Sequence, residues 1–78
     1  MKRTHLGKRL KAARVMKELT QEEAAEKLGV SRRTYINWEN KVFNMKHKDE
    51  MAIVKVLGIP NNEIILLRLR DQKEQEAE

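Results

Sequence analysis

Apolar residues recur at intervals of three and four in five short stretches of the chain, and no stretch alternates in the way a strand would. In the first stretch, Leu6, Leu10 and Ala13 fall on one side of a helix, which predicts a helix near residues 5–17. The other four stretches have similar spacing. The pattern therefore predicts an all-α domain of five short helices.

The second and third predicted helices are joined by a very short turn. Thr20, followed three residues later by Glu23, has the spacing of a capping box and starts a helix that ends before Gly29. Ser31, a good N-cap, opens the next helix only two residues after that glycine. Two helices joined through such a glycine turn have the layout of a helix-turn-helix. Its second helix is predicted over 31–40.

The last two predicted helices lie toward the C-terminus. One spans about 47–57 and ends at Gly58, and the next begins after Pro60 and contains the apolar run IILLRL. The chain that follows this run lacks apolar periodicity. We therefore expect a folded domain at 1–70 and a flexible polar tail at 71–78.

Composition narrows the class of protein. The 78 residues include no cysteine, which excludes disulfides and thiolate metal sites. No apolar run approaches the roughly 18 residues of a membrane span, and the basic start lacks the apolar stretch of a signal peptide. We expect a soluble, cytoplasmic protein that has no segment crossing a membrane.

Charge is divided unevenly along the chain. Residues 1–48 hold 13 Lys and Arg against 5 Asp and Glu, whereas residues 49–78 hold 4 against 7. The basic first part favours an anionic partner, and composition alone leaves both nucleic acid and a membrane surface open. Lys2 and Arg3 are either solvated charges or a basic arm that touches phosphate.

No residue pattern typical of catalysis is present. His5 and His47 lie far apart in the sequence without a cysteine nearby, so no metal site is predicted. Glu22, Glu23 and Glu26 form a cluster that lacks a nucleophile or a positioned histidine, and we interpret them as helix-stabilising charges. We expect no enzyme activity, no cofactor and no small-molecule substrate.

The third predicted helix has an apolar inner face and a polar outer face. Tyr35 and Trp38, three residues apart, mark the inner face. Arginine can pair with the two acceptors of guanine, asparagine can pair with adenine, and isoleucine can contact the methyl group of thymine. The outward residues that suit base edges in this way are Arg32, Arg33, Ile36, Asn37 and Asn40.

The segment LGKRLKAARVMKELTQEEAAEKLGVSRRTYINWEN, together with the later LGI, resembles the Cro/repressor-type (XRE-like) helix-turn-helix family of phages and bacteria. The resemblance covers about residues 5–67, and TQEEAAEKLGVSRRTYINWEN is its most specific part. It implies a lambda-repressor-like five-helix fold and a sequence-specific transcriptional regulator of the phage or mobile-element repressor type. It also implies a homodimer bound to a pseudo-palindromic double-stranded DNA operator.

The resemblance further implies roles for single residues. Arg14 and Glu39 match a pair that forms an internal salt bridge, so we assign both to structure. Gln21 matches a residue that contacts a phosphate and steadies the recognition helix. The positions that read bases are Ser31, Arg32, Arg33 and Asn37, to which the outer face adds Ile36, and those that hold the DNA backbone are Asn40, Lys41, Lys46 and Lys48.

The fifth predicted helix has more apolar residues than one side of a short helix can hide. We expect part of this stripe to form the homodimer surface. An alternative stays open, in which the chain is a protein-interaction module, such as an antitoxin or antirepressor, and keeps the helix-turn-helix mainly as a scaffold. The predicted dimer residues are Ile64, Ile65, Leu67 and Leu69.

Overall fold

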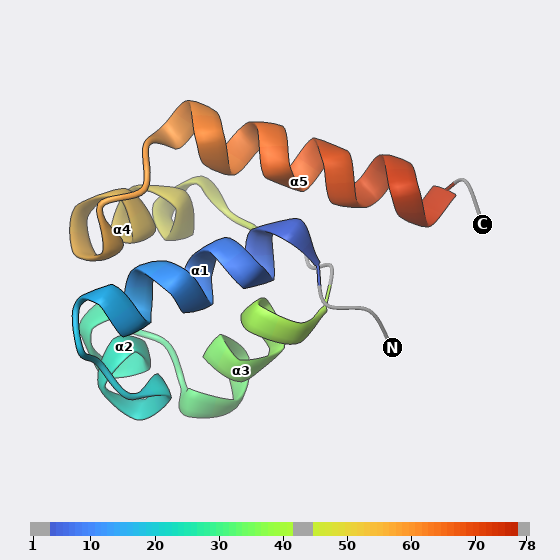
Figure 1. The fold of residues 1–78 in the computed structure, drawn as a ribbon. Helices are drawn as coiled ribbons and strands as arrows, with labels where there is room; N and C mark the ends of the chain where they lie inside the picture. The colour runs from blue at the N-terminus through green and yellow to red at the C-terminus, as the bar shows by residue number, and fades with distance from the viewer. Residues whose placement is uncertain (1–3, 42–44, 77–78) are drawn as a thin grey trace.

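A computed structural model describes residues 4–41 and 45–76, and every regular element within them is a helix. The predicted all-α class with five helices is confirmed. Figure 1 shows α1 across the middle of the molecule, with α2 and α3 on one side of it and α4 and α5 on the other. The helices are α1 (His5–Met16), α2 (Gln21–Leu28), α3 (Arg32–Asn40), α4 (His47–Leu57) and α5 (Asn61–Glu76).

The turn between α2 and α3 forms because its capping residues make the expected bonds. The Thr20 side chain accepts a hydrogen bond from the Glu23 N–H (3.0 Å), and the Glu23 carboxylate accepts one from the Thr20 N–H (2.8 Å). The bond from the Thr20 backbone is the main reason that the pKa of Glu23 lies below its ordinary value. Gly29 ends α2 with a φ of 75°, a left-handed conformation that glycine adopts without steric cost.

The core consists of one apolar stripe from each helix. Leu6 and Leu10 of α1, Tyr35 of α3, Ile53 of α4 and Ile64 of α5 are each no more than 2 % exposed. Their contacts bring α1 against α3 and α5, so α1 lies at the centre of the packing. Burying apolar surface is the main favourable contribution to folding. Because the apolar inner face of α3 is buried in this core, its outer face is left toward solvent.

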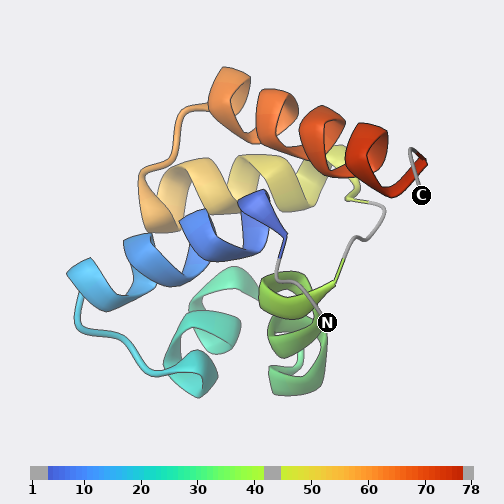
Figure 2. The same cartoon turned by 45° about the vertical axis from the view of Figure 1, so that its right-hand side comes forward.

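The fifth helix extends to Glu76, six residues beyond residue 70, where the sequence predicted the folded domain to end. Asp71 is buried, and its carboxylate accepts hydrogen bonds from the backbone N–H groups of His5 (2.7 Å) and Leu6 (3.1 Å). The first N–H groups of a helix have no partner inside it, so Asp71 caps α1 from another helix. His5 also pairs with Glu74. The expected flexible tail is therefore corrected for residues 71–76, which continue α5 as a helix, drawn in red in Figure 2.

Candidate nucleic-acid interface

The inner and outer faces of α3 differ in the way the sequence predicts. Tyr35 and Trp38 are buried, with their ring centroids 6.3 Å apart. Arg32 and Arg33 are exposed, and neither forms an ion pair with another described residue. Their guanidinium groups therefore keep all their donors for a ligand. The other outward residues are Ile36 and Asn37, which are half-buried, and Asn40, which is exposed.

Ser31 is held at the start of α3 by bonds within the helix. Its hydroxyl oxygen accepts a hydrogen bond from the Thr34 N–H (3.1 Å), and its hydroxyl proton is donated to the Thr34 hydroxyl (2.9 Å). A serine hydroxyl has a single proton to donate. Ser31, which was expected to read a base, therefore has only an acceptor left for one. Thr34, which the sequence pattern did not single out, sets this restriction because its hydroxyl accepts the Ser31 proton.

A buried polar cluster connects α3 to α1 and α2. The Nε atom of Arg14 donates to Glu39 Oε2 (2.8 Å), and an Nη atom of Arg14 donates to the carbonyl of Leu19 (2.8 Å). The amide of Gln21 donates to the other oxygen of Glu39 (3.2 Å). The structure thus brings together the pair that the family resemblance placed in a salt bridge. It also places Gln21 against α3.

Burial and the charge of Glu39 shift the pKa of Arg14 in opposite directions. Burial on its own would lower the pKa of Arg14, but the hydrogen bond and the negative charge of Glu39 raise that pKa above its ordinary value. The side chains of Arg14 and Glu39 are only 12 % and 4 % exposed. A buried pair of this kind is sensitive to the loss of one partner, because the remaining charge is left without compensation.

The Tyr35 hydroxyl lies beside the same cluster. It is buried and has no hydrogen-bond partner among the described residues. Burial, followed by the proximity of Glu39, raises the pKa of Tyr35 far above its ordinary value. The hydroxyl therefore stays neutral, and Tyr35 serves the inner packing of α3.

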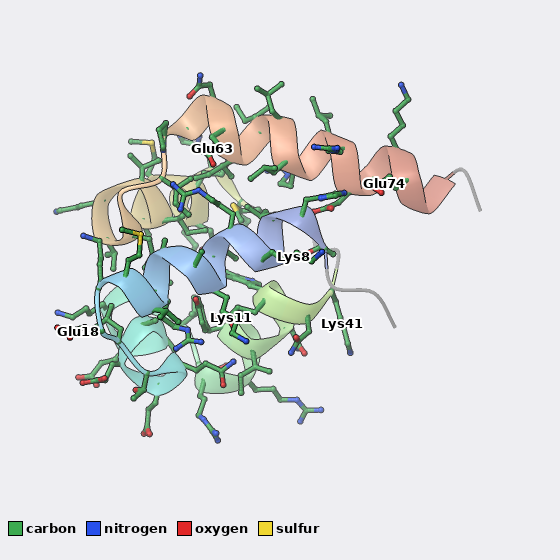
Figure 3. All side chains as sticks on the ribbon, viewed as in Figure 1. Lys8, Lys11, Glu18, Lys41, Glu63 and Glu74 are labelled. Carbon is green, nitrogen blue, oxygen red and sulfur yellow. The ribbon has the colours of Figure 1, made fainter. Side chains whose placement is uncertain are left out.

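The predicted phosphate contacts lie at the ends of three helices. Asn40 and Lys41 are exposed at the C-terminal end of α3, and Lys46 and Lys48 are exposed at the start of α4. Figure 3 shows Lys41 in its place at the end of α3. Gln21, at the start of α2, is half-buried and points its amide toward Glu39. The intervening loop residues 42–44 and the predicted arm, Lys2 and Arg3, lie outside the described residues.

Gly7 is a packing residue that the sequence analysis missed. It lies in the first turn of α1 and is buried where α1 crosses the last turn of α3. A Cβ atom at this position would lie 2.7 Å from the carbonyl carbon of Glu39 and still closer to its oxygen. The only signal in the sequence is a glycine inside a helical pattern, which can mark close backbone approach but does not identify the partner.

One group of side chains has the composition of a metal site. The ligand atoms of His5, Asp71 and Glu74 lie within 4.8 Å of one another. Both oxygens of Asp71 already accept backbone N–H groups, and His5 pairs with Glu74. These bonds account for the group as the link between α1 and α5. His5 lies far from Asp71 and Glu74 in the sequence, and the three residues are brought together only by the fold, so the sequence gives no sign of the group.

The predicted dimer stripe on α5 is divided between the core and the surface. Ile64 is fully buried within one chain, so its assignment to a dimer surface is wrong. Leu67 is half-buried against the core, whereas Ile65 and Leu69 are exposed. Leu66, which was not in the predicted set, is the most exposed of these residues at 64 %. The exposed part of the stripe therefore consists of Ile65, Leu66 and Leu69.

A family model described as "Helix-turn-helix domain" matches residues 7–69, a segment that begins in α1 and ends in α5. No curated protein matches the chain. Within the described part of the chain, no helix combines the length and apolar character needed to cross a membrane. The family match covers most of the chain and includes both helices of the turn.

Proposed function

The chain belongs to the helix-turn-helix domain family of the Cro/repressor type, and from this premise we propose that it is a sequence-specific transcriptional regulator that binds double-stranded DNA. We place it with the phage or mobile-element regulators of the repressor or Cro type. The observation that supports the proposal is the outer face of α3. On this face Arg32 and Arg33 are exposed and free of ion pairs with the described residues.

In the proposed complex, α3 lies in the major groove. That groove is about 12 Å wide and admits an α-helix. Arg32 or Arg33 pairs with guanine, Asn37 with adenine, and Ile36 contacts a thymine methyl group. The inner residues of α3 stay in the core, and the buried cluster of Arg14 and Glu39 keeps the helix at a fixed angle. This division lets the outer side chains read bases without disturbing the fold.

Attraction to the DNA backbone comes from residues around α3. Asn40 and Lys41 would meet phosphates beside the end of α3, and Lys46 and Lys48 would meet them at the start of α4. Gln21 would contribute from the start of α2, where a helix N-terminus favours an anion. Contacts of this kind supply affinity that depends strongly on salt and carries no sequence information.

We place the homodimer contact on the exposed part of the α5 stripe. Two copies related by a two-fold axis would present two recognition helices to a pseudo-palindromic operator, about 34 Å apart. Ile65, Leu66 and Leu69 are the exposed apolar residues of α5 that such a contact would cover. Large exposed apolar residues that gather on one element often mark an interaction surface.

The test is selection from a random duplex pool at two salt concentrations, with Trp38 fluorescence used to follow binding. Trp38 is the only tryptophan and lies in α3. We expect enrichment of a two-fold symmetric sequence and weaker binding at the higher salt concentration. Salt-sensitive binding without any enriched sequence would contradict the proposal. It would instead favour the alternative, a protein-interaction module that uses the apolar stripe of α5.

A further inference from the structure

We propose that Gly7 is a positioning residue for DNA recognition. The absence of a side chain at this point lets α1 touch the backbone of α3, and this contact sets the orientation of the recognition helix. The inference rests on the proposed function, because its effect is read through base preference. Gly7 lies on the side of α1 that faces the backbone of Glu39 in α3.

The contact leaves no space for even one added carbon. A Cβ atom on Gly7 would lie 2.7 Å from the carbonyl carbon of Glu39, whereas carbon atoms pack at about 3.5–4.0 Å. The Thr4 hydroxyl, which would lie 2.7 Å from this Cβ atom, could rotate away, but the nearest atom in the way is the backbone carbonyl oxygen of Glu39. Relief therefore requires the two helices to separate by roughly 1 Å.

The first turn of α1 is the less free of the two partners. Asp71 holds the N–H groups of His5 and Leu6, and the Thr4 hydroxyl accepts a hydrogen bond from the Gly7 N–H at 2.8 Å. Asp71 is itself buried on α5. Three bonds thus fix this turn against α5 and its own cap. The last turn of α3, by contrast, ends the helix one residue after Glu39.

A shift of that last turn would be felt on the outer face of α3. Asn37, the proposed adenine contact, lies in the same turn as Glu39, and Glu39 is also bonded to Arg14 and Gln21. A tilt would therefore move the base contacts of α3 as a unit. Lys46 and Lys48, which would attract phosphate, lie at the start of α4 outside this turn, so attraction to any DNA would persist.

The experiment compares Gly7→Ala with Ala12→Gly. Ala12 is exposed on the same helix, so its change to glycine weakens α1 without adding an atom against α3. Both variants and the wild type are titrated with the selected duplex and with an unrelated duplex, at a temperature where circular dichroism shows that all three are folded. The emission of Trp38 is recorded without DNA, as a reading of α3 packing.

We expect Gly7→Ala to raise the Kd for the selected duplex about tenfold or more, the loss of at least one good base contact. Its Kd for the unrelated duplex should change by less than about twofold, because the phosphate contacts of Lys46 and Lys48 on α4 are retained. The emission of Trp38 should also shift in Gly7→Ala and stay unchanged in Ala12→Gly. If the ratio of the Kd for the unrelated duplex to the Kd for the selected duplex is the same in Gly7→Ala and in the wild type, the inference is overturned.

Two further outcomes separate this inference from the proposed function. If the wild type shows no preference for any duplex, the proposed function fails, and the Trp38 emission still tests whether Gly7 sets the packing of α3. If Gly7→Ala is unfolded, the titration is repeated in trimethylamine N-oxide, which favours compact states. A Gly7→Ala chain that stays unfolded there would make Gly7 a folding residue and overturn the positioning role.

Discussion

Arginine has two opposite roles in this small domain, and burial separates them. Arg14 is bonded to Glu39 under α3 and helps to hold the helix. Arg33 is exposed on the opposite side of the same helix and forms no ion pair with a described residue. The first therefore contributes to the fold, and the second is free to contact DNA.

Replacing Arg33 by alanine tests whether this side chain reads a base. We expect the variant to lose about 1–3 kcal/mol of binding to the selected duplex and to relax the preference at one position of each half-site. Binding is measured by fluorescence titration against duplexes changed at single positions. Equal losses on every sequence would instead show that Arg33 contacts a phosphate.

Lys46→Ala is the matched comparison, because Lys46 is an exposed cation at the start of α4 rather than on the recognition helix. Its loss should weaken binding to all sequences alike. The slope of the logarithm of the binding constant against the logarithm of the salt concentration should become shallower by about one. An unchanged slope would remove Lys46 from the interface.

The buried hydroxyl of Tyr35 predicts a loss of stability in alkali. Burial raises the pKa of Tyr35 in the folded state, so this group keeps its proton above pH 10, where an unfolded tyrosine loses it. The unfolded state is then favoured, and the free energy of unfolding falls by up to about 1.4 kcal/mol per pH unit. Below the pKa of the unfolded tyrosine both states are protonated, and Tyr35 makes its full contribution to the free energy of unfolding.

Tyr35→Phe should lack this alkaline decrease. Its stability at pH 7 should stay within about 1 kcal/mol of the wild type, since the hydroxyl has no hydrogen-bond partner among the described residues. Urea unfolding from pH 8 to pH 11 measures the difference. Parallel pH profiles in the two proteins would show that Tyr35 ionises normally in the folded state.

At the scale of helices, the caps come from two sources. The start of α2 is capped by its own neighbours, Thr20 and Glu23, through a pattern four residues long. The start of α1 is capped partly by Asp71, which lies 66 residues after His5. The first kind of cap can be read directly from the sequence, whereas the second depends on how α5 packs.

Shortening the chain to residues 1–70 tests the second kind of cap. The change removes Asp71 with its two bonds to the start of α1, and also Glu74 with its pairing to His5. We expect it to lower the free energy of unfolding by about 2–4 kcal/mol. Urea denaturation followed by circular dichroism gives the value. A chain shortened to residues 1–76 keeps both bonds and should match the full-length protein. Equal stability of the 1–70 chain would show that Asp71 does not support α1.

At the scale of the whole molecule, the proposed DNA contacts and the apolar stripe lie on different helices. The outward arginines are on α3, and Ile65, Leu66 and Leu69 are exposed on α5. Figure 1 shows α3 and α5 on opposite sides of α1. A copy bound at the stripe would therefore leave the outer face of α3 open to DNA.

Leu69→Glu tests self-association through α5. A charge in an apolar contact lacks compensation and disfavours it, so we expect the wild type to sediment as a dimer and the variant as a monomer. The variant should also lose its preference for a symmetric site over a single half-site. Met16→Glu is the control, because Met16 is 83 % exposed on α1 and lies outside the stripe. A monomeric wild type would contradict the dimer.

The sequence by itself determined the features that depend on near neighbours. The five helices follow from apolar spacing, and their boundaries follow from local caps such as Thr20 and Gly29. The inner and outer faces of α3 follow from the spacing of Tyr35 and Trp38. The family resemblance supplied the pair of Arg14 and Glu39, which spacing alone would not join.

Only the tertiary structure decided features that join distant residues. It placed Asp71 against the start of α1, set Gly7 against the backbone of Glu39, and buried Ile64 while exposing Leu66. Periodicity shows which side of a helix is apolar, but the neighbour that covers that side is set by packing. For this reason the division of α3 into an inner and an outer face could be predicted from spacing, whereas the contact of Gly7 with the backbone of Glu39 could be found only in the fold.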